Sequence, residues 1–520
     1  MPKFKDYNQG QIMLLPPDIR DIIPSDHICY IINDVVDNMD ITLVEETYLN
    51  GTALGGASAL NPRMLIKAMF YSYSCGIRSS RLVEKRCRED LVFRYLSAGV
   101  SPDHSTINLF RKKHLIGLEK LFAQIVILCG QMNMTDFSDI SIDGSIFKAS
   151  ASKKNTFNRE EIAKWRKRMR KILREANKID KRENKKYGEG RGYDQLPPRL
   201  ADPETRKAEI KRLMDKMSKL DIAEEKIIAK QEKVKHETAL VRKASQHNNH
   251  NIVDKDANLM KLKSTKVVRP GYNGQIATSN QIITAYDVMD EAIDEPSLML
   301  VIEKSEENTK QPVKTVKADC GYWSKGNMEK LEGTEIDAYI PDRRKSFEEK
   351  GMRDGTLSKY HRNYFKYDEA NDEFICPEGK RLKLKITNRD KHDKTKITGK
   401  RYFCADCQKC RAKEKCTTSK QKQICVDWEL EKMKTIMRAK LNTKEGKRKY
   451  LERMYDVEPV FGNIKHNQKA ENFLCRGKPM VKLEFGLTCI AHNFVKISNW
   501  LRKEGNREQF EILMRRRACA

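Results

Sequence analysis

An α/β fold is the class that this sequence predicts, and three patterns along the chain support it. Segments typical of strands and of helices alternate between residues 246 and 345. Residues 1–136 carry the capping and turn residues of several short helices. Residues 154–245 repeat apolar side chains at spacings of three and four, which is the period of a helix. The expected organisation is an α/β core with a helical N-terminal domain, a helical-hairpin insertion and a small cysteine-rich insertion.

The helical N-terminal domain is predicted over residues 1–136. Asn61 can cap a helix that has Pro62 at its first position, and Gly76 lies just past the end of that helix. Ser79 or Ser80 can begin the next helix.

Short basic helices joined by tight turns resemble a helix-turn-helix arrangement, which binds in the major groove of DNA. The predicted phosphate contacts are Arg81, Arg86, Arg111 and Lys112, with Arg78, Lys85 and Lys113 beside them. Any single one of these cations is more often a solvated charge, so the prediction concerns the group as one surface.

The first strand of the core is predicted over residues 137–153. Ile140 and Ile142 fall on one face of it, and Ser141 and Asp143 on the other. An acid at the end of an apolar strand is typical of a functional site. The alternative is an aspartate that only caps a turn.

Residues 154–245 are predicted to form an antiparallel coiled-coil hairpin. Two apolar series repeat at helical spacing on either side of the break GEGRGYDQLPPRLADPE. They are Ile162, Trp165, Met169, Ile172, Ala176 and Ile179, and then Ile210, Leu213, Met217, Leu220 and Ile227. A passive spacer, a dimer contact and a DNA-binding arm all remain open as roles for this hairpin.

Residues 246–345 supply most of the predicted core. YNGQIATS and QIITAYDVMD form a β-hairpin that turns near Asn280, and Pro296 begins the helix SLMLVIEKSEEN. VKTVKAD is a strand that ends at Asp319. The helix SKGNMEKLE and the strand EIDAYIP follow it.

The cysteine-rich insertion covers residues 346–430 and contains Cys376, Cys404, Cys407, Cys410, Cys416 and Cys425. A structural zinc ion held by four thiolates would stabilise a small lysine-rich segment that has little core of its own. The run Cys404-x2-Cys407-x2-Cys410 also suits an iron–sulfur cluster. Unligated thiols are the third alternative.

Residues 431–500 complete the core, and residues 501–520 form an uninformative tail. Because Pro459 has no N–H, a helix is expected to start or bend there, with Glu458 at the N-terminal end. Glu458 and Lys465 are seven residues apart and share a helix face. Glu452 or Asp456 could replace Glu458 as the functional acid.

The composition favours a polyanionic partner. The chain has 101 Lys and Arg against 73 Asp and Glu, a net charge of +28. Contacts to phosphates release counterions, so an excess of this size favours nucleic acid, whereas a merely solubilising surface usually mixes both signs. We expect no secretory signal, because MPKFKDYNQGQ lacks an apolar core, and the apolar run Leu121–Cys129 is too short to cross a bilayer. We expect no membrane partner and a cytoplasmic, nucleoid-associated location.

Three acids stand out among the predicted strands and helices. Asp143 and Asp319 each end a predicted strand, and Glu458 opens a predicted helix. Carboxylates at strand ends can converge, and hard oxygen ligands are what Mg²⁺ requires. Two such ions would suit chemistry on a phosphodiester.

Several blocks of the sequence resemble the DDE transposases of bacterial insertion sequences. The spacing Tyr450-x2-Arg453-x4-Glu458-x6-Lys465 resembles their Tyr-Arg-Glu-Lys signature. DGSIFKASASKKN, PGYNGQIATS, ADCGYWSKGN and the stretch from NPRMLIKAMFYSYSCGIRSS to SPDHSTINLFRKKH resemble further blocks of the family. The resemblance covers most of residues 1–500 and is weakest in the helical hairpin.

The resemblance implies an RNase H-like core in which Asp143, Asp319 and Glu458 bind two Mg²⁺ or Mn²⁺ ions. Tyr450, Arg453 and Lys465 would orient phosphates or a displaced base. Cys376, Cys407, Cys410 and Cys416 resemble the cysteine knuckle of this branch, which would bind a structural zinc ion.

The function implied is a transposase that binds terminal inverted repeats and target DNA as a homodimer, and cleaves and joins DNA strands. One alternative is an RNase H-like nuclease that cleaves without joining. The other is a domesticated DNA-binding protein that no longer cuts, against which the three intact acids argue.

Overall fold

The computed structural model describes residues 18–48, 59–188, 203–234, 249–262, 267–389, 397–503 and 505–518. The chain divides into two compact units. The first contains Met1–Val313 and Tyr455–Ala520, and the second contains Lys314–Met454. Both contain helices and strands, which confirms the predicted α/β class.

Helices precede the first strand of the first unit. They are α1 (Ile19–Ile22), α2 (Ile28–Asp37), α3 (Thr42–Glu45), α4 (Pro62–Ser74), α5 (Ser80–Glu89), α6 (Leu91–Leu96), α7 (His104–Lys113) and α8 (Leu115–Gln131). The start of α4 is as predicted, because the Asn61 side chain accepts a hydrogen bond from the Arg63 N–H and Pro62 takes the first position. Among the described helices, none is by itself long and apolar enough to span a membrane. One pair, α7 with α8, meets that test only together and is bent by 79°.

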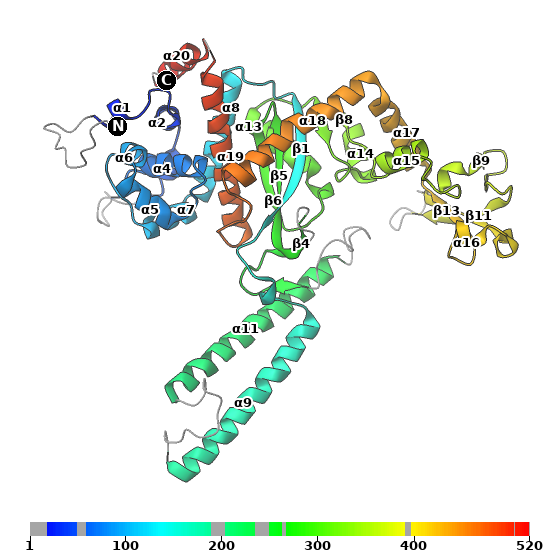
Figure 1. Cartoon of the computed structure of the whole chain (residues 1–520), viewed down its shortest axis with the longest axis horizontal. Helices are drawn as coiled ribbons and strands as arrows, with labels where there is room; N and C mark the ends of the chain where they lie inside the picture. The colour runs from blue at the N-terminus through cyan, green and yellow to red at the C-terminus, as the bar shows by residue number, and fades with distance from the viewer. Residues whose placement is uncertain are drawn as a thin grey trace, which may run out of the picture. The chain divides into compact units, whose positions relative to one another are not determined.

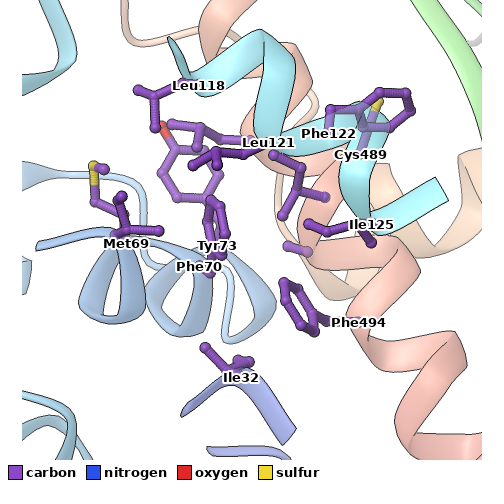
Figure 2. Packing of buried hydrophobic residues seen from close by; sticks show 14 of the residues in the cluster. Ile32, Met69, Phe70, Tyr73, Leu118, Leu121, Phe122, Ile125, Cys489 and Phe494 are labelled. Atoms are coloured by element: carbon purple, nitrogen blue, oxygen red, sulfur yellow. The ribbon is translucent and has the colours of Figure 1, made fainter. Parts of the chain in front are cut away.

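The main core of the first unit forms where α2, α4 and α8 meet α19 (Lys478–Leu501). Figure 2 shows Ile32, Phe70, Ile125 and Phe494 pointing toward this junction. The rings of Phe70 and Phe494 lie 5.6 Å apart, at a favourable distance for two aromatic side chains. Residues separated by more than 400 positions in the chain therefore share one core.

The sheet of the first unit is antiparallel and has a long central strand. β5 (Val268–Ser279) pairs with β1 (Asp139–Lys148), β4 (Asn258–Lys261) and β6 (Ile282–Met289). Asp143 lies opposite Ile276 in this register. Asn280 and Gln281 have φ of 48° and 64°, so the hairpin turns where the sequence predicts. α13 (Leu298–Thr309) packs on β6, and α19 covers β6 as well (Figure 1).

The predicted helical hairpin is present in the first unit. α9 (Arg159–Tyr187) and α11 (Pro203–Val234) lie side by side (Figure 1), next to the short pair β2 (Thr156–Phe157) and β3 (His250–Asn251). Their seam is a cluster separate from the main core: Phe157, Ile162, Met169, Leu213, Leu220, Ala223 and Ile227, with Trp165 and Met217 packed against it. The predicted seam is confirmed at seven positions: Ile162, Trp165, Met169, Leu213, Met217, Leu220 and Ile227. Phe157 and Ala223 also join it, although the sequence did not predict them. The side chains of Ile172, Ala176, Ile179 and Ile210 lie outside the described ones.

The second unit contains a parallel strand pair and a five-stranded sheet. β7 (Thr315–Ala318) and β8 (Asp337–Tyr339) are parallel and are joined through α14 (Lys325–Glu332). The larger sheet has the order β13-β12-β11-β10-β9. The strands of this sheet are β9 (Lys366–Asp368), β10 (Glu373–Ile375), β11 (Arg381–Arg389), β12 (Ile397–Cys404) and β13 (Gln423–Val426). The second unit also contains the helices α15 (Lys345–Arg353), α16 (Lys413–Cys416) and α17 (Trp428–Asn442).

Helix α18 (Lys444–Gly462) continues through Pro459, so a helix does not start at this residue. Proline cannot donate a hydrogen bond to the carbonyl four residues earlier. That carbonyl, on Tyr455, accepts one from the Gln281 side chain at 3.0 Å. The irregularity comes after Gly462 instead, as a π-helix over Asn463–Asn467. α20 (Asn506–Ala518) closes the described chain.

A buried ion pair joins the N-terminal helices to α19. The Arg78 guanidinium donates to the Glu484 carboxylate at 2.7 Å, and the two side chains are 7% and 1% exposed. Arg78 also donates to the carbonyls of Asn472 and Lys469, both at 2.7 Å. Its prediction as a phosphate contact is therefore wrong.

Replacing Arg78 with Met should lower the free energy of unfolding by about 3–5 kcal/mol, because it leaves a buried carboxylate without its cation. Arg88→Met is the control, since Arg88 is 61% exposed in its ion pair with Glu84. An exposed pair contributes about 0–1 kcal/mol. Chemical denaturation of both variants measures the difference, and equal losses would contradict the assignment.

Candidate functional site

One face of strand β1 carries the first predicted acid. Ser141 Oγ on this face donates to Asp456 Oδ2 at 2.7 Å, and the Phe147 ring lies 6.3 Å from that of Phe461. The segment from Asp456 to the π-helix therefore runs along the strand face that bears Asp143. Asp143 is half-buried, and its Oδ1 accepts the Gly144 N–H at 2.8 Å.

Lys465 lies in the π-helix and contacts the same strand, β1. Its ammonium donates to Ser145 Oγ at 2.5 Å and to the Ile146 carbonyl at 3.2 Å, and it lies 4.8 Å from the centre of the Phe147 ring. π-turns inside helices are frequent at functional sites, because they re-aim a side chain. In this structure the contacts of Lys465 position β1, and its predicted contact with a phosphate stays a prediction.

The glycine after Asp143 is required by a close approach on the opposite face of the sheet. A Cβ on Gly144 would collide with the Gln275 side chain and with Asp294. Asp294 Oδ1 accepts hydrogen bonds from Asn273 and Gln275, both at 2.7 Å, so this polar group has little room to shift. The Asp-Gly dipeptide thus places an acid on one face and leaves the other face free for a buried polar network.

Three acids of α18 are candidates for the functional acid: Glu452, Asp456 and Glu458. Glu458 has the most accessible carboxylate of these three. It is exposed, and within the part of the chain that the structure describes it makes no hydrogen bond or ion pair. Glu452 instead pairs with Arg448 at 2.5 Å and with Lys317 at 3.8 Å. Asp456 is bound to Ser141. These contacts favour Glu458 as the ligand-binding acid.

In the second unit, Asp319 directly follows β7 and accepts the Gly321 N–H at 2.7 Å. The Arg453 guanidinium lies 5.6 Å from the centre of the Tyr450 ring. Burial raises the pKa of Tyr450; Arg453 opposes that rise, and Asp319 and Cys320 add to it. Burial, followed by the Asp319 charge, also raises the pKa of Cys320. The charges of Arg453 and Asp319 thus both act on Tyr450.

The predicted N-terminal cations divide into exposed and buried ones. Arg81, Arg86 and Lys112 are exposed, but Arg111 is only 4% exposed. Its guanidinium donates to the Arg78 carbonyl at 3.2 Å and lies over the Tyr73 ring. The prediction of Arg111 as a DNA contact is therefore wrong. The signal was present in the sequence, because Arg111 follows Ile107 by four residues and so shares the buried face of α7.

The cysteines of the second unit are reduced thiols, and two accept backbone hydrogen bonds. The Lys380 N–H donates to Cys376 Sγ at 3.3 Å, and the Lys422 N–H donates to Cys407 Sγ at 3.4 Å. Burial, followed by the Cys407 thiol, raises the pKa of Cys404 to about 12. Among the described residues, no group of three or more His, Cys, Asp or Glu could hold a metal ion. Within these described residues, the structure thus shows neither the predicted zinc site nor a metal site formed by the predicted acids.

Two family models match the chain. A model described as "Transposase DDE domain" matches residues 375–498, which include Tyr450, Arg453, Glu458 and Lys465. A model described as a transposase domain matches residues 17–113, the N-terminal helices. No curated protein and no solved structure matches the chain. The two family matches support a DDE-type transposase.

Replacing Gly144 with Ala should lower the free energy of unfolding by about 1–3 kcal/mol, because the added methyl group overpacks the sheet against Gln275 and Asp294. Gly462→Ala in the same unit is the control, since a Cβ there meets nothing within 4 Å. Alanine favours a helix by up to about 1 kcal/mol over glycine. Thermal or chemical unfolding of the two variants tests this, and a neutral Gly144→Ala would refute the close approach.

Proposed function

We propose that this protein is a transposase that binds the ends of a mobile DNA element and cleaves and joins DNA strands through an RNase H-like core. The observation that carries the proposal is the strand bearing Asp143, held face to face with the segment around Glu458 by Ser141–Asp456 and Lys465–Ser145 contacts. The family matches at both ends of the chain support it. We include Asp319 as the third acid because of its place after β7 and the block ADCGYWSKGN around it.

The chemistry of these residues fits divalent cations. Asp143, Asp319 and Glu458 offer carboxylate oxygens, the hard ligands that Mg²⁺ and Mn²⁺ prefer. Glu458 is exposed, and Asp143 and Asp319 are half-buried, so each keeps some contact with solvent. Two such ions, when bound, supply activation of a nucleophile and stabilisation of charge on the leaving oxygen.

The remaining side chains position the substrate in this proposal. The Asp319 charge acts on Tyr450, and Arg453 lies over the Tyr450 ring, so Tyr450 and Arg453 are candidates to bind a phosphate or stack on a displaced base. Lys465 fixes β1 and with it the position of Asp143. Positioning of this kind matters because phosphoryl transfer relies on in-line geometry and charge stabilisation.

The DNA partners in the proposal are the terminal inverted repeats and the target duplex, bound by a homodimer. Exposed Arg81, Arg86 and Lys112 would bind phosphates of the repeats from the N-terminal helices. Phosphate contacts fix the register of a protein on DNA, and side chains that reach base edges provide sequence specificity.

Asp143→Asn and Glu458→Gln should each abolish cleavage of a plasmid that carries the element's inverted repeats in the presence of Mg²⁺. Both changes remove a charged metal ligand and keep the size of the side chain. DNA binding, measured by mobility shift without divalent ions, should stay within a few fold of wild type. Glu452→Gln is the matched control on the same helix and should keep its cleavage activity, because Glu452 is already paired with Arg448.

Full cleavage by Glu458→Gln together with loss of activity in Glu452→Gln would reassign the acid. Cleaved ends without joined products in the wild type would favour a nuclease that does not transfer strands. Specific binding with no cleavage at any divalent ion would favour a domesticated DNA-binding protein.

We further propose that Cys376, Cys407, Cys410 and Cys416 bind a structural zinc ion that draws their sulfurs together. Metal analysis of the purified protein should then find about one zinc per chain, lost in a Cys407→Ser/Cys410→Ser double variant with a lower unfolding midpoint. Iron with visible absorption would indicate a cluster that includes Cys404. A metal-free, equally stable protein would leave the cysteines as thiols.

A further inference from the structure

The outer face of α9 carries a continuous series of cations. They follow one another at spacings of three and four residues, so they form one stripe along the helix. The members of this α9 stripe are Lys164, Lys167, Lys171, Arg174, Lys178, Lys181 and Lys185, and all of them are exposed. The stripe is offset by two residues from the seam series that begins at Ile162, about 200° around the helix. It therefore faces away from α11.

The charge is unequal between the two helices of the hairpin. α9 has thirteen Lys and Arg against five Asp and Glu, a net charge of +8. α11 has nine against seven, a net charge of +2, although it is three residues longer. A solubilising surface would mix signs on both helices, as α11 does. The excess on α9 thus indicates a polyanionic partner for that helix.

The cations used inside the hairpin are distinct from the stripe. Arg166 donates to Asp221 at 2.9 Å and to Glu224, and so ties α9 to α11. Lys216 lies 3.9 Å from the centre of the Trp165 ring. Lys171 is the stripe member in an exposed ion pair with Glu175 at 3.9 Å, which contributes little to stability. Structural contacts therefore explain Arg166 and Lys216, but they leave the α9 stripe unexplained.

The described part of the hairpin's apolar seam is filled. Ile162 and Met169 of α9 and Leu220 and Ile227 of α11 are fully buried in it. At these described positions α9 and α11 cover each other, and no second copy of the chain is needed there. A partner that complements the stripe must instead bring negative charge.

The length of the stripe suits duplex DNA. From Lys164 to Lys185 an α-helix rises about 32 Å, at about 1.5 Å per residue. One turn of B-DNA is about 34–36 Å long. A cation thus recurs about every 5 Å over nearly one turn of a duplex.

We propose that the α9 stripe binds the phosphate backbone of duplex DNA, as an arm that adds affinity without reading sequence. This inference rests on the proposed function, and it assigns to the hairpin a DNA contact separate from the N-terminal helices. Such contacts release counterions, so they appear in the salt dependence of binding. Because they involve no base edges, they strengthen binding to specific and random duplexes alike.

The test uses two full-length variants with the same change in net charge. The stripe variant is Lys167→Gln/Arg174→Gln/Lys178→Gln, and the control is Lys211→Gln/Arg212→Gln/Lys219→Gln, which removes three exposed cations from α11. Equilibrium binding to random and inverted-repeat duplexes is measured across a salt series without divalent ions. Circular dichroism and sedimentation check the fold and the oligomeric state of each variant.

The stripe variant should reduce the slope of log K against log salt by about 2–3, since each phosphate contact contributes about 0.9. The control should change that slope by less than about 0.5. The inference would be overturned if the two variants showed the same salt slope, or if neither slope differed from that of the wild type. A changed oligomeric state in the stripe variant alone would also overturn it. If the stripe variant shows the expected change in slope but the wild-type protein does not cleave DNA, the proposed function is wrong, whereas the DNA-binding role of the α9 stripe is supported.

Discussion

The ion pair between Arg78 and Glu484 is the contact on which the arrangement of the first unit depends. Two charges withdrawn from water are costly unless each is fully paired, and here they are. Glu484 also accepts the backbone N–H groups of Leu474 and Cys475, at 2.9 and 2.8 Å. The segment 469–475 is therefore held by both partners. This segment extends the pairing of β1, because the Lys148 N–H donates to the Glu471 carbonyl and the Phe473 N–H donates to the Lys148 carbonyl.

A second constraint acts at the turn between β5 and β6. Gln281 donates to the carbonyl that Pro459 leaves without a partner, and its own carbonyl accepts a hydrogen bond from His492 of α19. Burial lowers the pKa of His492 to about 4, so the ring is neutral near neutral pH. Gln281 thus replaces the hydrogen bond that Pro459 cannot donate within α18, and it also binds His492 of α19. The segment with Glu458 and Lys465 gains its position from this pair of contacts.

Local patterns in the sequence predicted much of the fold and part of the site. The alternation around Asp143 placed Ser141 and Asp143 on one strand face, and spacings of three and four predicted the seam of Ile162, Met169, Leu220 and Ile227. Two predictions were wrong because distant partners decide them. Arg111 was expected at the surface, but it is buried against Tyr73. A helix does not start at Pro459, because α18 continues through it and the Gln281 side chain, 178 positions earlier in the chain, donates to the freed carbonyl.

The sequence by itself determined the α/β class, the described hairpin seam and the cap of α4. These follow from periodicity and from capping chemistry, which act over a few residues. Only the tertiary structure decided which charges are buried, which acid near Pro459 is uncommitted and where the helix becomes irregular. Burial and pairing depend on side chains hundreds of positions apart, such as Arg78 and Glu484, and no local pattern encodes such a partner.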